Sequence, residues 1–279
     1  MPQTGGPAGP GQGRIDLGED ILTRADAEAV AVLTLNNPAR LNALSDAMLD
    51  ALAGELDRLA GDAGIRAVIL RGAGRAFCAG HDLREMTEGR QAPDGGAAYF
   101  AALFEKCSRV MLAITRLPQP VIAEVHGIAT AAGCQLVATC DLAVAAEGTR
   151  FGVNGVNIGL FCATPRVALT RNIAPKRAFE MLTTGEMIEA EEAARLGLVN
   201  RVVPEAELGA AARALAGRIT GKLGPVVAVG KRTFYEQAGM GLAEAYEHAG
   251  RVMVTNMLRD DTAEGIGAFL EKRQPEWRQ

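Results

Sequence analysis

The sequence predicts an α/β protein with a purely helical C-terminal region. Short apolar runs typical of buried strands alternate with amphipathic helical stretches up to about residue 203. After Pro204 the periodicity is helical throughout. In addition, segments 68–86 and 121–136 share one plan, in which a strand leads through a turn of small residues into a helix. We therefore expect a disordered tail over residues 1–13, an α/β core over 14–203 and a helical region over 204–279.

Composition narrows the function classes. The 279 residues are 48% hydrophobic and 22% charged, which is ordinary for a soluble protein with a sizeable core. A net charge of −4 argues against nucleic-acid binding, and no apolar run is long enough for membrane insertion. The five cysteines lack C-x-x-C spacing, so we expect free thiols, no metal site and a cytoplasmic location. The Gly/Pro-rich opening, MPQTGGPAGPGQGR, predicts disorder and lacks the features of a signal peptide.

The expected strands are short runs rich in Val, Ile, Leu and Ala, at 15–24, 30–35, 67–71, 121–125, 142–145 and 198–203. The expected helices lie at 46–60, 97–115, 167–172, 175–182, 190–196, 205–220, 225–237, 242–257 and 262–272, with helix starts near 81–86 and 131–136. Ser45 is a suitable N-cap for the first helix, and Gly197 ends another. The first helix has one apolar face, formed by Met48, Leu49, Leu52, Leu56 and Leu59.

The two strand–turn–helix segments suggest a chemical role. Small residues at 72–80 and 127–133 let a ligand approach the backbone closely. Free N–H groups in the first turn of a helix attract negative charge. Two such turns that face each other can aim two N–H groups at one oxygen, which is the physical basis of an oxyanion hole. Gly72 and Gly74 do not form a nucleotide-binding loop, because the further motif residues are missing.

Five motifs in order resemble the crotonase family, the enoyl-CoA hydratase/isomerase superfamily, over residues 15–277. They are N-P at 37–38 with L-N-A-L at 41–44, R-A-F-C-A-G-H-D-L at 75–83, the 120–165 stretch, T-G-E at 184–186 with A-x-x-A-x-x-L-G-L-V-N at 190–200, and F-L-E-K-R at 269–273. The resemblance implies a spiral of ββα turns followed by a helical oligomerisation region. It also implies a homotrimer or a dimer of trimers.

The resemblance further implies an acyl-CoA thioester as the ligand, with coenzyme A part of the substrate and no separate cofactor. Carried over by position, the two oxyanion donors are the N–H groups of His81 and Ala132. The implied substrate-binding positions beside them are Ala79, Gly80, Leu83 and Gly133. The implied contacts to the adenine end are Arg40, Ala43 and, from the same or a neighbouring subunit, Lys272.

The sequence departs from the hydratase pattern at two positions. Hydratases of this family carry two glutamates that hold and activate water, and the matching positions here are Gln135 and Gly155. A positioned acid or base typically contributes about 10²–10⁴ in rate, so standard hydration should be severely impaired. On the sequence alone, replacing both residues by glutamate should create or raise hydration of crotonyl-CoA.

Other residues could take over the acid–base role. Asp82 and the His81 ring lie beside the first donor, but Asp82 also suits a helix N-cap. Asn154 and Asn157 could orient water or a substrate carboxylate, or support the loop. Cys162 could act as a nucleophile or be a buried structural thiol. An acyl-CoA decarboxylase or hydrolase and a non-catalytic acyl-CoA binder therefore remain alternatives to a hydratase-like enzyme.

Overall fold

The computed structural model describes residues 20–277. Six strands form the larger sheet, in the order β1-β2-β3-β4-β6-β9. Their bounds are β1 Leu22–Ala27, β2 Val30–Leu35, β3 Ala67–Gly72, β4 Val121–Val125, β6 Leu142–Ala146 and β9 Arg201–Val203. The β1–β2 pair is antiparallel and all the other pairs are parallel. The predicted alternation of strands and helices is confirmed, while the predicted tail and the start of the 15–24 strand lie outside the described residues.

The first strand is shifted from its prediction because an unusual hairpin follows it. Glu28 and Ala29 both adopt positive φ, at 52° and 61°, and join β1 to β2 as a two-residue turn. Such turns normally use Gly or Asn, so neither residue signals a turn in the sequence. As a result β1 runs to Ala27 instead of ending at Arg24.

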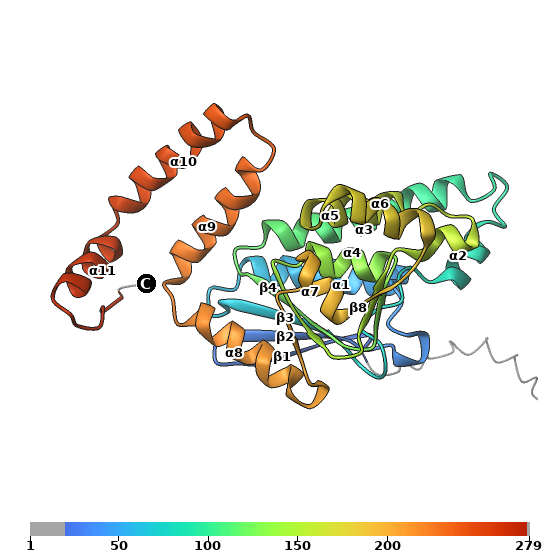
Figure 1. Ribbon diagram of the computed structural model, residues 1–279, viewed down its shortest axis with the longest axis horizontal. Helices are drawn as coiled ribbons and strands as arrows, with labels where there is room; N and C mark the ends of the chain where they lie inside the picture. The colour runs from blue at the N-terminus through green and yellow to red at the C-terminus, as the bar shows by residue number, and fades with distance from the viewer. Residues whose placement is uncertain (1–19, 278–279) are drawn as a thin grey trace, which may run out of the picture.

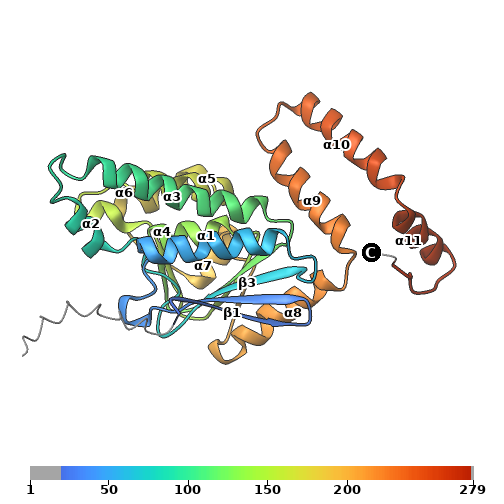
Figure 2. The ribbon, with the colours of Figure 1, turned by 180° about the vertical axis from the view of Figure 1, so that it is seen from behind.

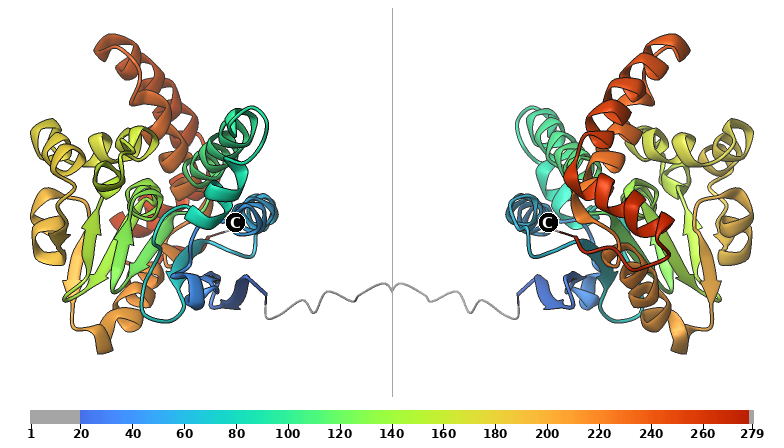
Figure 3. Two further views of the ribbon diagram at one scale, coloured as in Figure 1. Left: turned by 90° about the vertical axis from the view of Figure 1, so that its right-hand side faces the viewer. Right: turned by 90° about the vertical axis from the view of Figure 1, so that its left-hand side faces the viewer.

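Side chains alternate between the two faces of the larger sheet, as the pleat of a strand requires. On one face Leu33, Leu70 and Ala123 join a core with helices α1 (Asp46–Ala60), α3 (Ala97–Arg116) and α4 (Ala132–Thr139). On the other face Ile69 and Ile122 pack with helix α8 (Leu208–Thr220). Figures 1 and 3 show the resulting order of layers, with the sheet between α8 and the group of α1, α3 and α4.

A second sheet of three short strands was not predicted. Strands β5 (Ile128–Thr130), β7 (Arg150–Gly152) and β8 (Ile188–Glu189) pair in that order. Strand β5 lies inside the segment predicted as a turn, and the three strands are too short to show a period. This sheet matters for the site because the chain leaves β5 directly into α4.

The remaining helices follow the predictions, with shifted ends except for α7, which has its predicted bounds. They are α2 Leu83–Gly89, α5 Ala163–Asn172, α6 Pro175–Thr184 and α7 Ala190–Leu196, with short 3-10 turns η1 Pro38–Arg40, η2 Asn154–Ile158 and η3 Glu205–Glu207. Helix α5 begins four residues before its predicted start, because Pro165 is tolerated in a first turn. Strand β9 begins later than predicted, at Arg201, and Gly197 ends α7 in the left-handed conformation as expected.

The C-terminal helices α9 (Gly224–Gln237), α10 (Leu242–Met257) and α11 (Asp260–Leu270) form an arm that projects from the core (Figures 1 and 2). Among residues 20–277, no helix is both long and apolar enough to cross a membrane. The arm nevertheless exposes many large apolar side chains, namely Phe234, Leu242, Tyr246, Met253, Val254, Met257, Leu258, Phe269 and Leu270.

The arm is fastened to the core by a buried lysine. Lys231 Nζ pairs with Asp141 Oδ2 at 2.6 Å and donates to the carbonyl oxygens of Ile114 and Gln119 at 2.8 and 2.9 Å. Asp141 also accepts from the Tyr235 hydroxyl at 2.8 Å. Burial lowers the pKa of Lys231, although Asp141 opposes the shift. A desolvated ion pair and the hydrogen bonds around it therefore hold α9 against the core.

Candidate active site

The structure brings together three loops that the sequence analysis singled out. Leu44 N–H donates to the Gly80 carbonyl at 2.7 Å, and Ala79 N–H donates to the Leu41 carbonyl at 3.0 Å. On the other side, Thr130 N–H donates to the Cys78 carbonyl at 3.1 Å. The 78–81 loop is therefore held between the 41–44 loop and the start of α4.

The segments that carry Gly80 and Ala132 touch where the 78–81 loop meets the start of α4. We call this contact the junction. Gly80 has φ +91°, and a Cβ placed on it would lie 3.3 Å from Ala132 N, 3.1 Å from Thr130 O and 3.0 Å from Ala131 Cβ. A side chain at Gly80 would be strained by the positive φ, and its neighbours would have to move by a few tenths of an ångström. The predicted donors are the next residue, His81 N, and Ala132 N itself, and within the described residues neither N–H donates a hydrogen bond. Two unused backbone donors therefore lie on adjacent segments.

The direction of the Ala132 N–H depends on Ala131, whose role the sequence analysis did not foresee. Ala131 has φ +50° and ψ −120°, a conformation that normally requires glycine. Its own N–H is fixed by the Gly152 carbonyl at 2.9 Å. An alanine carries no sequence signal for positive φ, so the strained turn could not be predicted.

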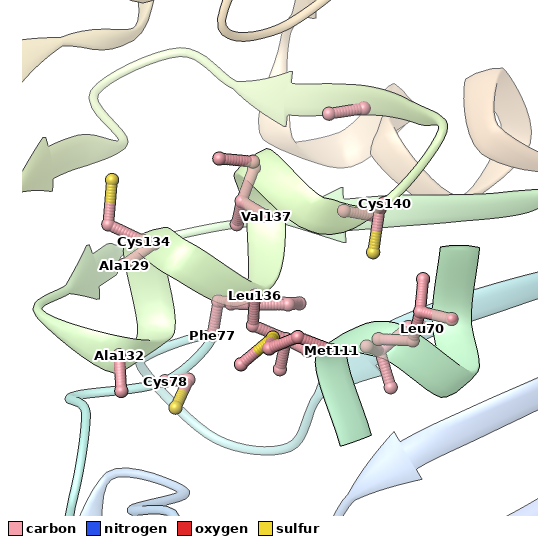
Figure 4. Close-up of a cluster of buried hydrophobic side chains, with 14 of the residues drawn as sticks. Leu70, Phe77, Cys78, Met111, Ala129, Ala132, Cys134, Leu136, Val137 and Cys140 are labelled. Atoms are coloured by element: carbon pink, nitrogen blue, oxygen red, sulfur yellow. The ribbon is translucent and has the colours of Figure 1, made fainter. Parts of the chain in front are cut away.

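Helix α4 is supported by a packed core. All of its residues are buried, and Figure 4 shows its apolar side chains among those of Leu70, Phe77 and Met111. A Cβ on Gly133 would lie 2.1 Å from the Cys78 carbonyl oxygen, so the 78–81 loop can pack this closely only against glycine. The site thus rests on rigid elements, as a preorganised electrostatic site requires.

Asp82, a candidate base, has its carboxylate already engaged. Oδ1 accepts from the N–H groups of Arg84 and Glu85 at 2.9 and 3.4 Å, and Oδ2 pairs with Arg40 Nη1 at 2.6 Å. Burial alone would raise the pKa of Asp82, but these hydrogen bonds outweigh it and the pKa lies below its usual range. Asp82 is the N-cap of α2, and this explains why the helix starts at Leu83 instead of the predicted 81.

We expect Asp82→Ala to lower the free energy of unfolding by about 1–2 kcal/mol through loss of the cap, and Asp82→Asn to lower it less, since Asn caps equally well. The lowered pKa means that the carboxylate stabilises the fold at neutral pH and loses this effect as the pH falls through the folded-state pKa, which lies below the ordinary value of an aspartate. Asp82→Asn should therefore remove part of the acid sensitivity. Urea unfolding at neutral and acidic pH measures both effects, and equal losses in the two variants would contradict the capping role.

His81 has a fixed ring orientation. Nδ1 lies 3.3 Å from the Leu44 carbonyl, which only accepts, so Nδ1 carries the proton and Nε2 holds a lone pair. The ring contacts Phe104 edge-on, and Nε2 is buried with no partner among the described residues. Burial lowers the pKa of this imidazole, which favours the neutral form. The ring is therefore held as a neutral imidazole, on the residue whose main chain supplies a donor.

Gln135 and Gly155, which stand where hydratases have glutamates, differ in the space that the structure leaves for a side chain. Gln135 lies one helical turn after Ala132, is 5% exposed, and its Oε1 has no hydrogen-bond partner within the described residues. A Cβ on Gly155 would lie 2.3 Å from the Leu160 carbonyl oxygen and 2.8 Å from Cys162 Sγ. The backbone of the 155–162 loop has taken this space. A glutamate at Gly155 would therefore require the 155–162 loop to move, and the expectation that glutamates at both positions raise hydration stays a prediction.

The remaining polar candidates are loop supports. Asn154 Oδ1 accepts from the Thr130 hydroxyl at 2.6 Å, which ties η2 to the end of β5. Asn157 Nδ2 donates to the Gly185 carbonyl at 3.3 Å. Thr130 was missed from the sequence because its partner is 24 residues away.

All five cysteines are free and buried. Burial raises the pKa of Cys162, and it raises the pKa of Cys78, Cys107 and Cys134 to about 12. These thiols are therefore protonated at neutral pH and are poor nucleophiles. Within residues 20–277, no cluster of three or more His, Cys, Asp or Glu side chains is arranged to hold a metal ion.

The other predicted substrate-binding residues lie in different parts of the structure. Arg40 and Ala43 belong to the loop that holds Gly80 and His81, so they lie beside the junction. Leu83 is 54% exposed at the start of α2. Lys272 comes two residues after the end of α11. Figure 1 shows α11 on the arm, away from α4 in the single chain.

These features define a class: an α/β protein in which a strand–turn–helix unit and a partner loop present two free backbone N–H groups. The chain belongs to the enoyl-CoA hydratase/isomerase family, whose model matches residues 25–279. This confirms the resemblance seen in the sequence.

Similarity to individual relatives and solved structures supports the family assignment. The mouse (Mus musculus) enoyl-CoA hydratase domain-containing protein 3, mitochondrial, is 44% identical over 99% of this chain and 89% of its own length. The crystal structure of the human protein of that name has a TM-score of 0.87 at 44% identity, covering 92% of this chain and 99% of that chain. A crystal structure of enoyl-CoA hydratase from Mycobacterium smegmatis has a TM-score of 0.89 at 53% identity. The match covers 94% of this chain and 100% of that chain. The predicted fold class, a crotonase-type spiral with C-terminal helices, is confirmed.

Proposed function

We propose that this protein binds acyl-CoA thioesters and polarises the thioester carbonyl through the N–H groups of His81 and Ala132. One observation carries the proposal: these two backbone donors are unused and lie on segments in contact at Gly80. Family membership supplies the substrate class. Coenzyme A is then part of the substrate, and no separate cofactor is needed.

The proposed mechanism uses electrostatic stabilisation. The thioester oxygen accepts both N–H groups, and these hydrogen bonds strengthen as negative charge develops on that oxygen in an enolate. Each such donor is worth about 10²–10³ in rate. Addition of water to an enoyl-CoA passes through this enolate, so a hydratase-like activity fits the site. Without a carboxylate at Gln135 or Gly155 to activate water, we expect hydration to be slow.

Decarboxylation of a 2-carboxyacyl-CoA is a second candidate, favoured by the filled space at Gly155. In this reaction the bond between the α-carbon and the carboxylate breaks, CO₂ leaves, and the electron pair moves onto the thioester oxygen as an enolate. A proton from water then restores the α-carbon. The step needs an oxyanion hole but no general base, and this matches a site in which Asp82 is engaged and the 155–162 loop excludes a second carboxylate.

We also propose that the arm mediates self-association into a trimer or a dimer of trimers. Helices α9–α11 and the turns between them expose many large apolar side chains, and exposed apolar side chains that gather on one part of a molecule mark an interaction surface. Sedimentation of the full chain tests this. A cytoplasmic location stays a prediction, which cell fractionation would test because the mouse relative is named as mitochondrial.

The test is hydration of crotonyl-CoA, followed by loss of ultraviolet absorbance, beside decarboxylation of malonyl-CoA and thermal stabilisation by butyryl-CoA. We expect butyryl-CoA to raise the melting temperature, because a ligand that prefers the folded state stabilises it. Slow hydration of crotonyl-CoA would support the hydratase-like reading, and faster release of CO₂ would support the second candidate. Stabilisation without either reaction would identify a binding protein, and no stabilisation would contradict the proposal.

A further inference from the structure

The Ala132 N–H is held on its helix side by the main chain. The peptide plane between Ala131 and Ala132 carries this donor. The carbonyl of the same plane accepts from Gln135 N–H at 3.0 Å, as the first hydrogen bond of α4. Because a peptide unit is planar, this bond also limits how far the N–H on the opposite side of the plane can tilt.

The strand side of the same turn is held by Thr130 and Ala131. Ala131, at φ +50°, has a conformation that is strained for alanine, and such a conformation persists only where neighbouring groups hold it. Thr130 N–H donates to the Cys78 carbonyl at 3.1 Å, and Ala131 N–H donates to the Gly152 carbonyl at 2.9 Å. The Thr130 hydroxyl adds a bond to Asn154 Oδ1 at 2.6 Å. This third bond is the one formed between two side chains.

Asn154 is a firm partner for this bond because η2, which it begins, is itself fixed. The Gly155 carbonyl accepts from Leu160 N–H at 2.9 Å, which closes the turn directly after Asn154. Further along η2, Asn157 Nδ2 donates to the carbonyl of Gly185, the residue that ends α6. A continuous set of contacts therefore leads from the end of α6 through η2 to the last residue of β5, directly before the strained turn.

We propose that Thr130 and Asn154 are positioning residues for the Ala132 N–H. Their hydrogen bond keeps the strained turn in the conformation that aims this N–H at the thioester oxygen. A hydrogen bond weakens steeply as its angle leaves the optimum, so a small rotation of the turn would remove much of the carbonyl polarisation. This role rests on the proposed function of the donor, and it goes beyond support of the 155–162 loop.

The experiment measures the infrared C=O stretch of butyryl-CoA, labelled with ¹³C at the thioester carbonyl and bound to Thr130→Val. Valine keeps the shape of threonine and removes the hydroxyl. We expect the wavenumber, lowered in the wild type, to return toward the value of the free thioester. Thr130→Ser keeps the hydroxyl and should keep the wild-type wavenumber. In the reaction that the wild type catalyses, Thr130→Val should lower kcat by about tenfold and leave KM within about threefold, because the donor acts mainly in the transition state.

The matched control is Thr139→Val, at the far end of α4. The Thr139 side chain is buried and its hydroxyl donates to the Gln135 carbonyl at 2.8 Å, so this variant removes a comparable bond without touching the turn. We expect the wild-type wavenumber in it. If circular dichroism shows that Thr130→Val does not fold, Asn154→Ala removes the same bond from its other partner and provides the test.

A wild-type wavenumber in Thr130→Val would overturn the positioning role. So would an equal return toward the free value in Thr130→Ser or Thr139→Val, because the effect would then not come from the hydroxyl beside the turn. A wild-type protein that does not lower the wavenumber of the bound thioester would instead contradict the proposed function of the two N–H donors.

Discussion

Gly80→Ala is expected to lower the turnover of the acyl-CoA substrate by about 10²–10³. The added Cβ would lie 3.3 Å from Ala132 N and 3.1 Å from Thr130 O, so the loop and α4 must separate by a few tenths of an ångström. This movement separates the two donors that are proposed to share one oxygen. Steady-state kinetics with the substrate that the wild type turns over measures the loss. The variant should also show less stabilisation by butyryl-CoA.

Gly148→Ala is the control for this change. Gly148 has φ +73°, close to the +91° of Gly80, but a Cβ there meets nothing within 4 Å. Both alanines carry a similar backbone penalty of about 1 kcal/mol, and only Gly80→Ala affects the junction. Wild-type turnover in Gly148→Ala is expected. Wild-type turnover in Gly80→Ala would show that this junction has no role in catalysis.

Lys231→Met is expected to lower the free energy of unfolding by about 3–5 kcal/mol. The lysine side chain is 6% exposed and neutralises Asp141, which is 14% exposed. Its removal leaves the carboxylate buried without a cation, and two carbonyl oxygens lose their donor. Urea unfolding of the full chain measures the loss. A detached α9 would also appear as faster proteolysis of the arm.

Lys106→Met is the matched control. Lys106 Nζ also contacts two carboxylates at 2.9 Å, those of Asp46 and Asp50, but both acids are largely exposed at 41% and 65%. Solvent can replace this lysine, so we expect a loss of less than about 1 kcal/mol. Similar losses in the two variants would refute the view that the Lys231 pair fixes the arm.

The parts of the fold that the sequence predicted are those with long, regular patterns. The helix at 46–60 was placed correctly because Ser45 caps it and an apolar face recurs through it. The 242–257 helix was also placed to the residue. The small sheet was missed because strands of two or three residues show no period, and the β1–β2 turn was missed because Glu28 and Ala29 are unusual at positive φ.

The site was predictable where glycine or helix position defines it. The turns of small residues between strand and helix predicted the roles of Gly80, Gly133 and the start of α4. The close backbone contacts at the two glycines explain why small residues occur there. The engagement of Asp82 by Arg40, 42 residues away, depends on tertiary structure. The closure of the space at Gly155 by the Leu160 carbonyl depends on backbone path, which no residue type reveals.

The most direct test of the central claim is the infrared C=O stretch of butyryl-CoA labelled with ¹³C at the thioester carbonyl. Two hydrogen bonds from His81 and Ala132 should weaken this bond. We therefore predict a lower wavenumber for the protein-bound thioester than for the thioester free in water, and a return toward the free value in Gly80→Ala. A bound thioester with the wavenumber of the free one would contradict carbonyl polarisation at this site.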